Sequence, residues 1–157
     1  MSRSLLKTIV ESAVKIEEQS YALYTEAQGR AKLPSSKVLL SELAQAELNH
    51  KEKLLAIMQD QADVSQLGSP AGRVEDLRIV DFLEETTLSE NADFKTILTY
   101  AAKREKSTYE HYSSLAKGLF ARYFPTVGRL FSKLAEEELI HKNRLEREYA
   151  KYALKGD

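Results

Sequence analysis

Apolar residues recur every three or four positions over four long segments, which is the spacing that places them on one face of an α-helix. The predicted helices span about 4–28, 37–61, 91–117 and 125–154. Pro34-Ser35-Ser36 should form a short connection with a serine N-cap for the second helix. Gly29 and Gly118 should end the first and third helices, and Pro125 suits the first turn of the fourth. The pattern therefore predicts an all-α fold.

The segment between the second and third helices, residues 62–91, is too long for a simple antiparallel connection. It contains Gly68, Pro70 and Gly72, followed by a short amphipathic piece at 74–86. Such a length suits a crossover along a bundle on the order of 40 Å tall. We expect two helix hairpins joined by this crossover.

The chain also contains an internal repeat. Residues 17–24 align with 105–112, and residues 43–50 align with 134–141, at offsets of 88 and 91 residues. A three-residue insertion near Gly118 would explain the difference. Two related hairpins that face each other form a four-helix bundle with approximate twofold symmetry.

Six polar residues interrupt the apolar faces at matching places in the repeat. A Glu and a His lie three residues apart in the second and fourth helices, and one Glu stands on the first and on the third. They are Glu17, Glu47, His50, Glu105, Glu138 and His141. Buried carboxylates are costly unless they are paired or bind a metal. Two divalent cations would balance four carboxylates, so we predict a dinuclear metal site with these six ligands.

The alternative for the same residues is a buried ion network without metal. One Glu-x-x-His pair would mean little in a chain this rich in Glu, but two of the three histidines carry it, on apolar faces and at repeat positions. Four Glu and two His could not balance without several protonated carboxyls. The metal site is the stronger hypothesis.

Other residues near these positions receive weaker predictions. His111 lies off the apolar face and is expected at the surface or near the site, not as a ligand. Tyr24 and Tyr112, each seven residues after a predicted ligand, are core aromatics that could donate hydrogen bonds to ligand carboxylates across the bundle.

Four acidic residues of the predicted helices are assigned to solvent. Glu18 and Glu137 point about 100° away from the ligands beside them, although Glu137 could reach His141 four residues on. Glu146 and Glu148 lie among arginines and are expected on a solvated helix face.

Composition excludes several classes of function. The 157 residues include 23 basic and 24 acidic side chains, which gives no field to attract nucleic acid or a membrane surface. With no cysteine, the chain has no disulfide, thiolate metal site or cysteine nucleophile. Charged residues recur too soon after the N-terminus to leave the apolar stretch of a signal peptide, and no apolar run reaches membrane-spanning length. We expect one cytoplasmic domain over residues 1–157.

The paired motifs resemble those of the ferritin-like superfamily, and within it the rubrerythrin-type di-iron domain. The resemblance covers nearly the whole chain and is carried by four features: Glu17 with Tyr24, Glu47-x-x-His50, Glu105 with Tyr112, and Glu138-x-x-His141. It implies a ferritin-like four-helix bundle in which the six residues named above ligate two irons. Manganese or zinc could occupy the site in a purified sample.

The resemblance implies a binuclear iron oxidoreductase that reacts with hydrogen peroxide or dioxygen, as a peroxidase protecting against oxidative stress. The alternative is an iron-binding or ferroxidase protein without peroxidase turnover. Rubrerythrins carry a four-cysteine rubredoxin domain that this chain lacks, so electrons would come from a separate donor protein. Their peroxidases tend to have an extra Glu one turn after the third-helix ligand, where this chain has Thr108. A homodimer is also expected from the resemblance.

Overall fold

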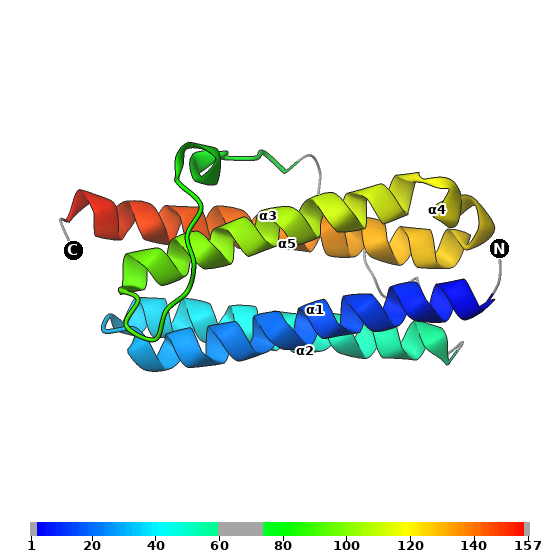
Figure 1. Ribbon diagram of the computed structural model, residues 1–157, viewed down its shortest axis with the longest axis horizontal. Coiled ribbons are helices and arrows are strands. Elements are labelled where there is room, and N and C mark those ends of the chain that lie inside the picture. The colour runs from blue at the N-terminus through cyan, green and yellow to red at the C-terminus, as the bar shows by residue number, and fades with distance from the viewer. Residues whose placement is uncertain (1–2, 60–73, 156–157) are drawn as a thin grey trace.

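The computed structural model describes residues 3–59 and 74–155, and every regular element in these ranges is a helix. In chain order the elements are α1 (Arg3–Arg30), α2 (Pro34–Met58), the 3-10 helix η2 (Ile79–Phe82), α3 (Phe94–Lys117), α4 (Leu119–Tyr123) and α5 (Pro125–Leu154). The four long helices lie side by side along one axis, with α1 packed on α2 and α3 on α5 (Figure 1). The predicted all-α, ferritin-like four-helix bundle is confirmed.

Helix α2 ends at the right of the view and α3 begins at the left, so the two helix ends that the connection joins lie at opposite ends of the bundle (Figure 1). This placement agrees with the predicted crossover. Gly68, Pro70 and Gly72 lie outside the described residues. In the second hairpin, the short helix α4 lies in the connection where the repeat predicts an insertion.

Two expectations about the first hairpin are wrong. Helix α1 continues through Gly29 and ends at Arg30. Leu33, directly before Pro34, has an extended backbone. Helix α2 then begins at Pro34, without a serine cap, because proline fits the first helical turn and has no N–H to satisfy. Ser36 instead donates from Oγ to Glu148 Oε1 at 2.6 Å. Helix α2 ends at Met58, and the predicted end at 61 lies outside the described residues.

The second hairpin follows the prediction more closely. Helix α3 begins at Phe94 instead of residue 91, because Asp93 is its N-cap and accepts a hydrogen bond at Oδ1 from Thr96 N at 2.8 Å. Gly118 follows the last residue of α3 as predicted, and α5 spans Pro125–Leu154 as predicted.

The outer face of α5 is covered by the end of the crossover. Val80 of η2 is fully buried, and its N–H donates to Glu146 Oε2 at 2.5 Å. Leu77 N donates to Asn143 Oδ1 at 3.1 Å, and Lys142 Nζ lies 2.8 Å from Asp76 Oδ1.

The prediction that Glu146 and Glu148 lie on a solvated face is therefore wrong. They are only 1% and 4% exposed. The crossover covers the first, and Ser36 of α2 hydrogen bonds to the second. A helix's own periodicity cannot reveal a second segment that covers its outer side.

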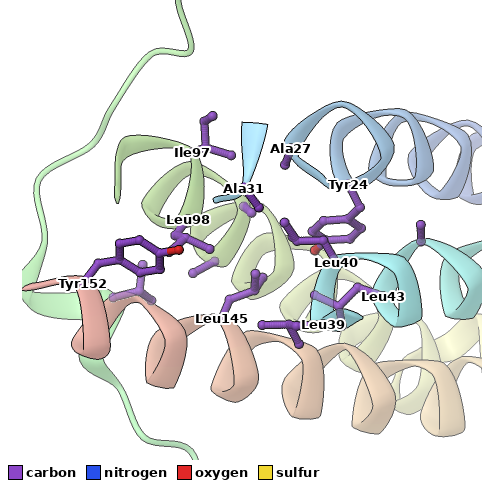
Figure 2. Close-up of a cluster of buried hydrophobic side chains, with 14 residues drawn as sticks. Tyr24, Ala27, Ala31, Leu39, Leu40, Leu43, Ile97, Leu98, Leu145 and Tyr152 are labelled. Atoms are coloured by element: carbon purple, nitrogen blue, oxygen red, sulfur yellow. The ribbon is translucent and has the colours of Figure 1, made fainter. Parts of the chain in front are cut away.

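The hydrophobic core consists of two clusters separated along the bundle axis. One contains Tyr24, Leu43, Leu98 and Leu145 and is drawn in Figure 2. The other contains residues nearer the N-terminus of α1 and the C-terminus of α3, such as Val10, Tyr112, Leu130 and Phe131. In each long helix, the predicted ligands lie between the residues of these clusters. The core therefore has a polar layer in its middle.

None of the described helices combines the length and apolar character needed to cross a membrane.

Candidate metal centre

The structure brings the six predicted ligands together in the polar layer. Each long helix contributes, and none of the six exposes more than 7% of its surface: Glu17 of α1, Glu47 and His50 of α2, Glu105 of α3, and Glu138 and His141 of α5. Side chains 88 or 91 residues apart in the chain therefore face one another, as the repeat requires.

The donor atoms form two overlapping groups. In each group, one nitrogen or oxygen from every residue lies within 4.8 Å of the others. The first group is Glu17, Glu47, His50 and Glu138, and the second is Glu47, Glu105, Glu138 and His141. Glu47 and Glu138 belong to both groups. Two cations held here would share these carboxylates, while each would have one further Glu and one His.

Unpartnered buried atoms show that the six residues fit a pair of metal ions. Both carboxylate oxygens of Glu47 and of Glu138 lack a hydrogen-bond partner, as do Oε2 of Glu17 and of Glu105. A buried polar atom without a partner costs about 1–3 kcal/mol. Glu47 and Glu138, which belong to both donor groups, thus have two free oxygens each. Glu17 and Glu105, which belong to one group each, have one free oxygen each.

The remaining oxygens of Glu17 and Glu105 are held by tyrosines. Tyr24 of α1 donates from its hydroxyl to Glu105 Oε1 of α3. Reciprocally, Tyr112 of α3 donates to Glu17 Oε1 of α1 at 2.9 Å. Burial, and then the charge of the adjacent carboxylate, raises the pKa of each tyrosine hydroxyl above its usual value. Both hydroxyls therefore stay protonated and act as donors.

Without a cation, the carboxylates of the layer repel one another. Burial, followed by the charge of neighbouring carboxylates, raises the pKa of Glu47 and of Glu138 well above the usual range. The pKa of Glu105 is also raised, chiefly by burial. Burial opposes ionisation of Glu17 too, but its interactions with His50 and other neighbours lower its pKa overall. Without a cation the layer therefore retains protons, which bound cations would displace.

The two imidazoles have the same orientation. His50 Nδ1 lies 2.9 Å from Glu138 Oε1, and His141 Nδ1 lies 2.9 Å from Glu47 Oε1. Each therefore approaches the shared carboxylate of the opposite hairpin. The rings are nearly parallel, at 10°, with centroids 5.7 Å apart. Both Nδ1 atoms are buried without a hydrogen-bond partner, so each could ligate a cation once it carries no proton.

The surroundings of the two imidazoles differ. Burial lowers the pKa of His50, but hydrogen bonding and charge from Glu137 and Glu17 outweigh it and raise that pKa to about 9. The pKa of His141 falls to about 3 through burial and the charge of His50. The repeat therefore produces two similar but unequal halves.

Glu137 is the residue near the site that the sequence prediction misplaced. Its Oε2 contacts Nε2 of His50 on α2, and its side chain is 28% exposed. It is therefore neither fully solvated nor directed at His141. The only sequence signal was its place beside Glu138, and only the closeness of α2 and α5 reveals the partner.

Three other predictions concern residues beside the ligands. Glu18 is solvated as expected and pairs with Lys51. His111 is exposed and lies outside both groups of donor atoms. Thr108 donates from Oγ1 to the Arg104 carbonyl at 3.0 Å, so the position one turn after Glu105 adds no carboxylate.

Comparison with known proteins identifies a family. The family described as Rubrerythrin matches residues 8–80 and 96–157, a span that contains all six predicted ligands. Neither the curated proteins nor the solved structures gave a match. The family match covers most of the chain and agrees with both the helical bundle and the buried carboxylate–histidine layer. The chain belongs to the rubrerythrin family.

Proposed function

We propose that this protein is a binuclear iron-binding oxidoreductase that reacts with hydrogen peroxide or dioxygen. The observation that carries the proposal is the pair of donor groups sharing Glu47 and Glu138, whose four carboxylate oxygens are buried without a hydrogen-bond partner. An oxygen-rich set with two imidazoles suits iron or manganese, and zinc could fill it in a purified sample. Membership of the rubrerythrin family favours iron.

Reduction of one hydrogen peroxide to two waters consumes two electrons and two protons. Bound ferrous iron would supply these electrons, one from each ion of a pair. The chain's own residues prepare the site for that exchange. Tyr24 and Tyr112 fix the orientation of Glu105 and Glu17, and the hydrophobic clusters on both sides keep bulk water out.

Several partners belong to the same proposal. Because the chain has no cysteine, the electrons that restore the ferrous state would come from a separate donor protein. A homodimer and a cytoplasmic location are part of the proposal as well, and the homodimer rests on the family resemblance.

A second candidate is an iron-binding or ferroxidase protein without peroxidase turnover. Thr108 favours it, because this side chain bonds to its own helix where peroxidases of the family tend to have a carboxylate. In this case the ions would be held and oxidised, but no repeated reduction of peroxide would follow.

The test is to load metal-free protein anaerobically with two equivalents of ferrous ion and add hydrogen peroxide in portions. We expect near-ultraviolet absorption of ferric protein to rise until one peroxide per chain is consumed. Continued consumption after a chemical reductant is added indicates catalysis, whereas a single round indicates the second candidate. If no ferrous ion is retained, both candidates fail.

The matched variants replace histidines inside and outside the layer. The double variant His50→Ala/His141→Ala should lose iron and the absorption change. His111→Ala removes a histidine of the same bundle that lies outside both donor groups, and it should behave as the wild type.

A further inference from the structure

The two predicted metal positions differ in the partner of the second imidazole nitrogen of each histidine. His50 presents Nδ1 to the carboxylates of the layer, while its other nitrogen, Nε2, contacts Glu137 Oε2 from α5. His50 is 1% exposed, so its imidazole is enclosed by protein where it meets Glu137. The imidazole is thus held between the layer and one additional carboxylate.

The internal repeat shows that this feature exists in one half only. At the offset of 91 residues, His141 corresponds to His50, Glu138 to Glu47, and Glu137 to Ala46. A methyl group therefore stands where the other half has a carboxylate. Among the described residues, both carboxylates within ion-pair distance of His141 face its Nδ1.

A carboxylate that accepts the second N–H of a ligating histidine has defined effects. It selects the tautomer with the proton on the far nitrogen, fixes the ring plane, and makes the ligating nitrogen more basic. Loss of such a partner typically lowers metal affinity 10- to 100-fold. These effects act on one metal position when only one histidine has the partner.

We infer that Glu137 is a positioning residue that makes the two metal positions unequal, so that a divalent cation fills the Glu17–His50 position before the Glu105–His141 position. The inference rests on the proposed metal binding. It does not depend on peroxide chemistry, because the order of filling is a property of the ligands alone. Glu137 lies outside both donor groups and would act through His50.

The experiment titrates metal-free, full-length protein with Co²⁺ and follows heat release and visible absorption. We expect two resolved binding steps in the wild type. In Glu137→Gln, the tighter step should weaken about 10- to 100-fold while the weaker step changes by less than about threefold. A uniform weakening of both steps, or no weakening, would overturn the inference.

A second variant supplies the missing carboxylate. Ala46→Glu should place an acceptor beside His141 by the symmetry of the repeat, and should tighten the weaker step so that the two steps merge. If circular dichroism shows that Glu137→Gln does not fold, the Ala46→Glu variant tests the inference in its place. An unchanged weaker step in folded Ala46→Glu protein would then count against the inference.

A spectroscopic readout separates positioning from general stabilisation. In the dicobalt protein, proton NMR should show two shifted, exchangeable imidazole N–H signals, of which the His50 signal exchanges slowly with water. Glu137→Gln should make this signal exchange faster, because the hydrogen bond that protects the Nε2 proton is weakened. Equal exchange of both signals in the wild type would contradict the assigned role.

The control is Glu18→Gln, which removes a carboxylate next to a predicted ligand but on the solvated face, where it pairs with Lys51. It should leave both steps unchanged. If the wild type binds no Co²⁺, the proposed metal binding itself fails. If two Co²⁺ bind and Glu137→Gln changes neither step, metal binding stands and only the inference about Glu137 is lost.

Discussion

At the scale of single residues, the hydroxyl groups of two tyrosines decide how two carboxylates present their oxygens. Tyr112 holds Glu17 Oε1 and leaves Oε2 free, and Tyr24 does the same for Glu105. A carboxylate that lost this bond would keep a second buried oxygen without a partner. The hydroxyls therefore stabilise the layer and limit the rotation of the carboxylates.

Replacing Tyr112 by Phe should remove this bond with little change in packing. We expect the free energy of unfolding of the metal-free protein to fall by about 1–3 kcal/mol, since a hydrogen bond to a charged group is lost in the interior. Urea denaturation followed by circular dichroism measures the change. Tyr109→Phe, at a half-buried position of the same helix, is the matched control. Its free energy of unfolding should fall by less than about 0.5 kcal/mol. Equal losses in the two variants would contradict the role given to the Tyr112 hydroxyl.

At the scale of elements, the start of α3 depends on one charged cap. Asp93 accepts hydrogen bonds from Thr96, and these bonds lower the pKa of its carboxyl below the usual value. A group whose pKa is lower in the folded state stabilises the fold above its unfolded pKa. That contribution disappears as the pH falls through the folded pKa.

The pH dependence of this cap can be measured against an uncharged one. Asp93→Asn also caps a helix but does not titrate. At pH 7 the wild type should be more stable than Asp93→Asn by up to about 1 kcal/mol, through the charge at the helix N-terminus. This difference should vanish below the lowered pKa of Asp93. Urea denaturation of both proteins at several pH values checks it, and a difference that stays constant down to pH 2 would contradict the assignment.

At the scale of the whole molecule, the polar layer separates two hydrophobic clusters and so weakens the metal-free fold. The eight unpartnered donor atoms of the six predicted ligands are all buried. Cations that satisfied these atoms would bind the folded chain and would find no such arrangement in the unfolded chain. Metal binding should therefore raise the stability of the entire bundle.

Thermal unfolding tests this link between the centre and the fold. With free metal at about 100 times the dissociation constant, one occupied site adds about 2.7 kcal/mol. For a chain of this size, that raises Tm by roughly 5–10 °C. Calorimetry with Mn²⁺, and with EDTA in its place, measures the shift. The His50→Ala/His141→Ala protein should show no shift, and a shift of equal size in that variant would place the stabilising ion elsewhere.

Much of this architecture follows from local pattern. The apolar spacing predicts four long helices, and the bounds of α5 agree with the prediction because Pro125 marks its start. The same spacing places Glu47 and His50 on a buried face, because the helical period alone decides which side chains share a face. The repeat then predicts that this pair meets Glu138 and His141 across the bundle.

Other features required the tertiary structure. Ser36 and Glu148 are buried because α2 and α5 meet, and Glu146 is buried because the crossover lies over it. Glu137 contacts His50 for a similar reason. A sequence period describes one helix at a time, so it determined which residues face the common core. It could not show which outer helix faces a second segment covers. On those faces, only the packing of segments distant in the sequence determined which group each charged side chain contacts.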